Sequence, residues 1–184
     1  MRNGDVLQCS AAFAIIENRE GTEMDINALS KRFRVLRLGE EDVERIYELS
    51  CGNRIFYQYH PPFVTRESIR EDMTALPPHK TEKDKFYVGF FEREELIAVL
   101  DLILGYPEET VAWIGLFMME ACRQNRGIGS AIIGEIRQCL KARGYKELRL
   151  GVDRGNPQSY AFWSKNGFTV LREEAYIQMR QELE

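Results

Sequence analysis

The chain has 184 residues, of which 44% are hydrophobic and 29% are charged, so it can form one folded domain and is no disordered segment. Its 25 Lys and Arg residues against 29 Asp and Glu residues give a net charge of -4, which excludes a general nucleic-acid-binding protein. The four cysteines form no Cys-x-x-Cys pair, so we expect reduced thiols in a cytoplasmic protein and no metal site. No apolar run reaches the roughly 20 residues that span a bilayer, so we expect no membrane segment.

The first 30 residues lack the regular pattern of the rest of the chain. We therefore expect an N-terminal extension over residues 1–30 and one domain over residues 31–184. Glu20 and Gly21 can be encoded by a purine-rich tract like a bacterial ribosome-binding site, which makes Met24 a candidate translation start. The alternative is a helix packed on the domain through an apolar stripe of Leu7, Ala11, Ala14 and Ile15. Both interpretations stay open.

Regular elements are predicted from residue 32 onwards. Arginines alternating with apolar residues predict a strand over 32–38, and an acidic start with an apolar stripe predicts a helix from 40 to about 52. The aromatic segment 55–63, which contains two prolines, predicts a loop, and a capped helix is predicted from Thr65 until Pro77. Residues 86–91 and 96–104 are predicted to form a hairpin, followed by a third strand over 110–119.

The second half of the chain alternates between helices and strands. An apolar face at helical spacing predicts a helix over 128–144 that Gly144 ends. A strand is predicted over 147–152, a short helix over 157–166, and a final strand or hairpin over 168–179. The order βααβββαβαββ predicts one α/β domain in which helices cover the faces of a mixed sheet.

The segment 123–131 joins a predicted strand directly to a predicted helix. Backbone N–H groups at a helix start lack partners within the helix and lie at the positive end of its dipole, so they can bind an anion. Gly127 and Gly129 would let a ligand approach the backbone, and Arg123 and Arg126 carry charge suited to phosphate. The alternative is a tight strand-to-helix connection with two solvated arginines.

Two motifs carry a family resemblance. Residues 124–129 read Gln-Asn-Arg-Gly-Ile-Gly, and residues 156–168 read Asn-Pro-Gln-Ser-Tyr-Ala-Phe-Trp-Ser-Lys-Asn-Gly-Phe. In order and spacing they resemble the signature motifs of the GNAT superfamily of acyl-CoA-dependent N-acyltransferases. The resemblance covers about residues 31–184. It implies a mainly antiparallel sheet with a splayed parallel pair, helices on both faces, and acetyl transfer from acetyl-CoA to an amine without a metal.

The resemblance also implies a cofactor site in the wedge between the strands at 110–119 and 147–152. Backbone groups of Phe117 and Met119 would bind the pantetheine arm, the amides of residues 124–129 would bind the pyrophosphate, and Asn156 would hold the cofactor near its thiol. The residues assigned to the cofactor are Phe117, Met119, Gln124, Asn125, Arg126, Gly127, Ile128, Gly129, Ser130 and Asn156. For the side chains of Phe117 and Met119, the alternative is an ordinary core strand.

One position departs from the family pattern. Many members carry a tyrosine four residues before the final glycine, where it can protonate the leaving thiolate, whereas this chain has Trp163, whose indole is no acid near neutral pH. Tyr160 is expected on the same helical face and is the candidate acid, with water as the alternative. Asp101, a carboxylate in an apolar strand, is the candidate base or substrate anchor, or else an exposed rim residue.

The acceptor is the least specified part of the expected reaction. Phe56, Tyr57 and Tyr59, together with His60, are candidates for a wall of the acceptor pocket, or else they pack the helices on the sheet. The leading hypothesis is direct attack of a primary amine, with a small molecule favoured, on acetyl-CoA in a ternary complex. A peptide acceptor is one alternative, and a non-catalytic acyl-CoA-binding sensor is another. We expect a monomer or a homodimer.

Overall fold

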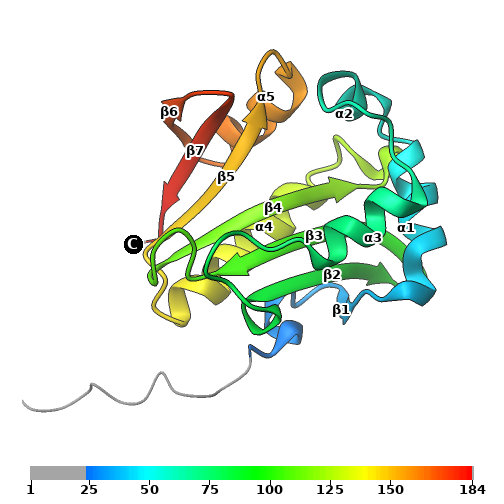
Figure 1. Ribbon diagram of the computed structural model, residues 1–184. Coiled ribbons are helices and arrows are strands. Elements are labelled where there is room, and N and C mark those ends of the chain that lie inside the picture. The colour runs from blue at the N-terminus through cyan, green and yellow to red at the C-terminus, as the bar shows by residue number, and fades with distance from the viewer. Residues whose placement is uncertain (1–23, 184) are drawn as a thin grey trace, which may run out of the picture.

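The computed structural model describes residues 24–183, and the questions raised for residues 1–23 lie outside this range (Figure 1). Within it, the strands form one seven-stranded sheet in the order β1-β2-β3-β4-β5-β7-β6. All neighbouring strands are antiparallel except β4 and β5, which are parallel. This confirms the predicted mixed sheet. The strands are β1 (Arg34–Arg37), β2 (Lys85–Glu92), β3 (Glu95–Leu104), β4 (Val111–Met119), β5 (Glu147–Asp153), β6 (Thr169–Glu173) and β7 (Tyr176–Glu182).

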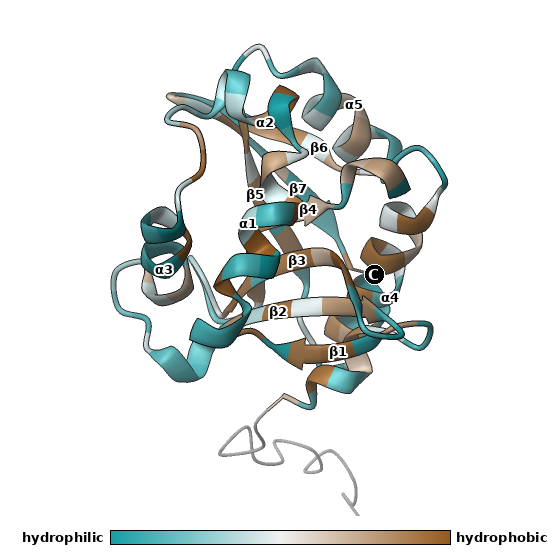
Figure 2. Cartoon of the chain, turned by 90° about the vertical axis from the view of Figure 1, so that its right-hand side faces the viewer, coloured by the Kyte–Doolittle hydropathy of each residue, from teal (hydrophilic) through white to brown (hydrophobic). Residues whose placement is uncertain are grey.

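Helices cover both faces of the sheet, as expected. Figure 2 shows the apolar strands between α3 on one side and α4 on the other. The α-helices are α1 (Val43–Cys51), α2 (Arg54–Tyr59), α3 (Arg66–Thr74), α4 (Ile128–Ala142) and α5 (Pro157–Lys165). The short 3-10 helices are η1 (Ile26–Leu29), η2 (Glu40–Asp42), η3 (Glu82–Asp84) and η4 (Ala121–Arg123).

The prediction of a loop over 55–63 is wrong in its first half, where α2 forms. The N–H of His60 donates to the carbonyl of Phe56 at 3.0 Å and closes the last turn of this helix. A proline restricts the residue before it but not residues further back, so Pro61 stops the helix at His60 without preventing it from starting. The sequence of this segment shows no helical periodicity of apolar residues, because its aromatic side chains pack against several neighbouring elements.

Two apolar cores lie on opposite faces of the sheet. On one face α4 buries Ile132, Ile136 and Leu140 completely. On the other face α1 and α3 contribute residues such as Ile46 and Ile69. Almost every residue of β2 and β3 is buried because both faces of these central strands are covered.

The packed structure begins before the domain boundary that we expected at residue 31. Met24 and Leu29 are buried in the core beneath α4. The hydroxyl of Ser30 donates to the carboxylate of Glu135 on α4 at 2.6 Å. Residues 24–30 therefore pack against the domain.

The parallel strands β4 and β5 separate half-way along β4. Residues 111–114 pair with residues 147–150, and no pairing follows. On the other side of β4, Asp101 of β3 lies opposite Leu116 whereas Leu102 lies opposite Ile114, so Gly115 is one extra residue, a β-bulge. Figure 1 shows the two strands diverging beyond this point. The divergence leaves one backbone edge of β4 without a strand partner.

Candidate cofactor and active site

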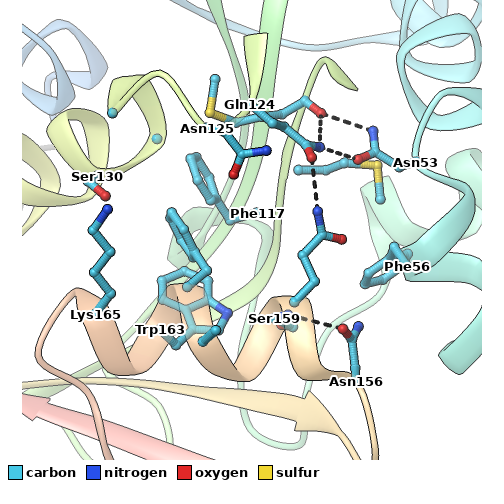
Figure 3. A pocket seen from close by; sticks show the side chains of 17 residues that line it. Asn53, Phe56, Phe117, Gln124, Asn125, Ser130, Asn156, Ser159, Trp163 and Lys165 are labelled. Carbon is cyan, nitrogen blue, oxygen red and sulfur yellow. Dashed lines mark hydrogen bonds between the residues drawn. The ribbon is translucent and has the colours of Figure 1, made fainter. Parts of the chain in front are cut away.

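A cavity of about 390 Å³ opens where β4 and β5 diverge (Figure 3). Its walls are the end of β4, the turn into α4, one face of α5, and two residues around the start of α2. Eight of the ten residues assigned to the cofactor line it, namely Phe117, Met119, Gln124, Asn125, Gly127, Gly129, Ser130 and Asn156. Arg126 and Ile128 are not among the lining residues.

The start of α4 forms one wall of the cavity and is open to a ligand. Gly127 precedes the helix with φ of +76°, and no side chain of the described residues caps the helix start. A Cβ at residue 127 would meet no atom within 4 Å, so its position faces open space. The first N–H groups of α4 are therefore free to donate to an anion in the cavity.

Gly129 has a different role from Gly127. A Cβ at residue 129 would lie 2.8 Å from the sulfur of Met119 and 3.3 Å from the ring of Phe162. The missing side chain thus lets α4 approach both β4 and α5 closely. Close packing at the back of the cavity accounts for this glycine.

Arg123 does not supply charge to the cavity, contrary to our expectation. Its guanidinium donates to Glu120 at 2.9 Å and to the carboxylates of Glu92 and Glu95 at the β2–β3 turn. These carboxylates, with Glu92 first, raise the pKa of Arg123. The side chain therefore ties the loop after β4 to the neighbouring hairpin.

Lys165 is a cation of the cavity that the sequence did not single out. It lies in the last turn of α5 and lines the cavity, and Figure 3 shows its ammonium directed towards Ser130 at the start of α4. It forms no ion pair within residues 24–183. A lysine without a carboxylate partner beside a helix start suits a phosphate group.

We expect Lys165→Met to weaken acetyl-CoA binding about tenfold, because one cation at the anion site is lost. Arg126→Met is the matched comparison, and we expect a smaller effect because Arg126 is exposed and outside the cavity wall. Calorimetric titration at two salt concentrations measures both, and the Lys165 effect should shrink at high salt. A larger loss in the Arg126 variant would contradict the assignment.

Three side-chain amides form a chain across the cavity mouth (Figure 3). Gln158 of α5 donates to Gln124 at 3.0 Å, and Gln124 donates to the side-chain oxygen of Asn53 at 2.7 Å. Asn53 and Gln124 also both donate to the carbonyl of Met119, at 2.9 and 3.2 Å. The chain thus links α5, the turn before α4 and the start of α2.

These contacts show which way the backbone of β4 faces. The carbonyl of Met119 points away from β3, and backbone groups two residues apart in a strand point the same way, so those of Phe117 also face the divergence. This is the arrangement that binds an extended ligand arm as an added strand. A carbonyl has two lone pairs, so a ligand N–H at Met119 would replace one of the two amide donors.

Comparison with known proteins identifies the family to which this fold and cavity belong. Residues 43–168 match the family described as Acetyltransferase (GNAT) family. The chain belongs to this family. It is a GNAT acetyl-CoA-dependent N-acetyltransferase, which confirms the resemblance seen in the sequence. No curated protein sequence gives a significant match.

Solved structures of low sequence identity share the fold. An acetyltransferase from Thermus thermophilus is 20% identical, covers 82% of this chain and 96% of its own, and superposes with a TM-score of 0.69. The PaiA N-acetyltransferase from Thermoplasma acidophilum in complex with coenzyme A is 22% identical, with 82% and 98% coverage and a TM-score of 0.63. The ribosomal-protein-S18-alanine N-acetyltransferase from Escherichia coli is 14% identical, with 82% and 93% coverage and a TM-score of 0.58.

In this GNAT acetyltransferase, Trp163 lies in the cavity wall, whereas Tyr160, three residues earlier on α5, does not. Trp163 is 5% exposed and lines the cavity, where its ring packs against those of Phe117, Phe162 and Phe168. Tyr160 is 42% exposed and does not line the cavity. Residues three apart on a helix differ by about 60° in direction, which at the edge of a buried face puts one inside and the other outside.

Asn156 caps the helix that carries these residues. Its side-chain oxygen accepts a hydrogen bond from the N–H of Ser159 at 3.0 Å, and its amide also lines the cavity. The residue is 3% exposed. Asn156 therefore both starts α5 and lies in the wall of the cavity.

Of the three aromatic acceptor candidates, only Phe56 lines the cavity. Tyr57 packs into the core under α1 and α3, and the ring of Tyr59 lies beside Gly155. The ring of His60, the residue that we grouped with these aromatics, stacks on Phe56, and its Nδ1 lies 3.1 Å from the carboxylate of Asp153 at the end of β5. The end of α2 is thus linked to the end of β5 by this side-chain contact.

Asp101 is buried, so the interpretation as an exposed rim residue is wrong. It is 9% exposed, and the ammonium of Lys85 lies 2.8 Å from each of its two carboxylate oxygens. It does not line the cavity but projects from β3 on the face that α1 and α3 cover. Burial raises the pKa of Asp101, and the charge of Lys85 acts against this.

Residues 24–183 contain no cluster of three His, Cys, Asp or Glu side chains that could hold a metal ion. No helix among them has the length and apolar character needed to cross a membrane.

Proposed function

We propose that this acetyltransferase transfers the acetyl group of acetyl-CoA to a primary amine by direct attack in a ternary complex, and that the amine is a small molecule. One observation supports the cofactor part of the proposal: the uncapped start of α4 and the unpaired edge of β4 face the same cavity. An anion site and a backbone edge at this spacing suit a cofactor with a pyrophosphate and an amide-containing arm.

The cofactor would extend from the start of α4 to the divergence of the strands. The amides of residues 124–129 would hold the pyrophosphate, with Ser130 and Lys165 beside it. Phe117 and Met119 would bind the pantetheine arm through their backbone groups. The family resemblance implies that Asn156, which lines the cavity, holds the cofactor near its thiol end.

In the transfer itself, the amine nitrogen attacks the thioester carbonyl, a C–N bond forms and the C–S bond breaks. The nitrogen loses its proton to a base, for which we propose Asp101. A thiol has a pKa near about 8.5, so the thiolate of CoA can depart near neutral pH and take a proton from water. Water is favoured over Tyr160 because that side chain lies outside the cavity wall.

The test is an assay of thiol release, corrected for hydrolysis, across amino acids, polyamines, aminoglycosides and N-terminal peptides, with products identified by mass spectrometry. We expect one class of small amine to be acetylated. Acetylation of peptides alone would assign a macromolecular acceptor instead. Tight binding of acetyl-CoA without turnover of any amine would favour the alternative function, a sensor, which the presence of Trp163 at the usual acid position supports.

On a confirmed acceptor, we expect Tyr160→Phe to leave kcat within about twofold of the wild type across pH. General acid assistance is typically worth about 10²–10⁴ in rate, so its loss would be obvious. The measurement is kcat at saturating substrates, with the affinity for acetyl-CoA measured separately. A fall of tenfold or more at unchanged affinity would restore the tyrosine as the proton donor.

A further inference from the structure

Asp153, the last residue of β5, lies beside one end of the cavity. Asn156 and Phe56 are at this end of the cavity, and Lys165 is at the other (Figure 3). The N–H of Asn156 donates to the carbonyl of Asp153 at 3.1 Å, so a tight turn holds these two residues within about 7 Å of each other. With the pyrophosphate near Lys165, the thioester of the cofactor would lie at the Asn156 end. Asp153 is therefore close to the place where an amine must attack.

The side chain of Asp153 projects to the face of the sheet opposite α4. Side chains alternate along a strand, and Leu148, Leu150 and Val152 of β5 are buried in the core beneath α4. Asp153 therefore points to the other face, which α1 and α3 partly cover. An amine that reaches Asp153 from this face would meet the cofactor from the side opposite the start of α4. Both substrates can then be bound at the same time.

No permanent cation within residues 24–183 balances the charge of the Asp153 carboxylate. Its ion-pair partner in this range is His60, whose Nδ1 lies 3.1 Å from each carboxylate oxygen. Arg154, next in the chain, instead pairs with Glu173 at 3.0 Å and donates to the carbonyl of Glu174 at 2.9 Å. A carboxylate can accept about four hydrogen bonds, so one imidazole N–H leaves capacity for another donor. The side chain of Asp153 is 27% exposed and can be reached by a ligand cation.

Aromatic side chains flank this carboxylate. Tyr176 of β7 lies directly opposite Asp153 in the sheet, so the two side chains are on the same face. The ring of Tyr176 leans over Gly151, where a Cβ would lie 2.8 Å from it. From α2, the ring of His60 stacks on Phe56 with the ring centroids 5.1 Å apart, and Phe56 lines the cavity. A carboxylate with aromatic rings beside it suits an ammonium group.

We propose that Asp153 binds a second ammonium group of the acceptor, so that the substrate is a diamine or polyamine and not a monoamine or an amino acid. This inference rests on the proposed amine acetylation. One nitrogen would attack the thioester near Asn156 while the other is held at Asp153. The separation of the two positions suits two nitrogens joined by about three to five carbon atoms. A carboxylate in place of the second ammonium would be repelled by Asp153.

The first test uses the wild type and three acceptors of similar length. Pentylamine has a methyl group where putrescine has its second ammonium, and γ-aminobutyrate has a carboxylate there. We expect kcat/KM for putrescine to exceed that for pentylamine at least about tenfold, because only the diamine forms a charge-assisted contact with the half-buried carboxylate. The value for γ-aminobutyrate should be the lowest of the three. Equal values for putrescine and pentylamine would overturn the ammonium site at Asp153.

The second test changes Asp153 itself. Asp153→Asn keeps the size of the side chain and removes its charge, so kcat/KM for putrescine and pentylamine should come within about twofold of each other. Asp153→Lys should make γ-aminobutyrate a better acceptor than putrescine. Glu94→Gln is the matched control, because it removes the same charge from a side chain that is 88% exposed at the β2–β3 turn, and it should keep the preference of the wild type. An undiminished preference for putrescine in Asp153→Asn would overturn the role of Asp153.

The outcomes separate this inference from the proposed function. Thermal melting shows that the variants are folded, and Asp153→Asn should bind acetyl-CoA with the affinity of the wild type in calorimetry, because Asp153 is not in the cavity wall. If the wild type acetylates pentylamine as well as putrescine, the amine acetylation stands and the second-ammonium site is overturned. If the wild type binds acetyl-CoA but acetylates no amine, the proposed function fails and the inference falls with it.

Discussion

Gly127→Asp is expected to weaken acetyl-CoA binding on the order of a hundredfold relative to Gly127→Asn. The two side chains have the same shape, and both tolerate the left-handed backbone that the φ of +76° requires. The aspartate places a negative charge in the open space of the cavity at the start of α4, where the pyrophosphate would lie. Repulsion of a few kcal/mol at an effective dielectric near 20 accounts for this factor.

The same substitution should act on stability in the opposite direction. A carboxylate at a helix start interacts favourably with the helix dipole, so Gly127→Asp should unfold at an equal or higher temperature than Gly127→Asn. Calorimetric titration and thermal melting of both variants measure the two effects, and the difference in affinity should diminish at high salt. Equal affinities of the Asp and Asn variants would place the pyrophosphate elsewhere.

Trp163→Ala should lower the free energy of unfolding by about 3–5 kcal/mol. The indole is 5% exposed and packs edge-on against Phe162 and Phe168, with ring centroids 4.9 and 5.0 Å away. Its removal leaves a large cavity between α5 and the strand that follows. It also removes part of the wall that the cofactor would contact, so acetyl-CoA should stabilise the variant less than the wild type.

Tyr160→Ala in the same helix is the control, because this side chain is largely exposed. We expect a change within about 1 kcal/mol, since alanine favours the helix and little packing is lost. Urea unfolding of both variants, followed by circular dichroism, gives the comparison. Similar losses in the two variants would show that Trp163 has no special part in the packing.

The order of elements was predictable from the sequence because most of them have their own periodicity and end signals. The hairpin of β2 and β3, the amphipathic α4 and the proline-started α5 are examples. Helix α2 was not predictable, since six residues are too few for a periodic pattern and its aromatic residues find their partners in other segments. The burial of Met24 depends likewise on contacts with distant parts of the chain.

The turn at the start of α4 was predictable because its chemistry is local, whereas the partners around it were not. Arg123 carries the charge expected for phosphate, but its carboxylate partners lie 28 and 31 residues earlier in the chain. Asn53 joins the site through a residue 71 positions away. Gln158 and Lys165 could have been predicted as site residues from the sequence. Gln158 lies four residues before Phe162 and Lys165 three residues after it, so all three share one face of the predicted helix.

The bulge at Gly115 makes the shape of the sheet at the site depend on one inserted residue. Ile114 and Phe117 point to the α4 side of the sheet, and Leu116 and Met118 point to the α1 side. Because Gly115 is the inserted residue, deleting its codon would keep every one of these side chains on its present face, so both cores would survive. We expect such a deletion to reduce the separation of the two parallel strands, because the bulge lies where their pairing ends. On this expectation, one in-frame codon decides whether β4 keeps an open backbone edge beside the cavity.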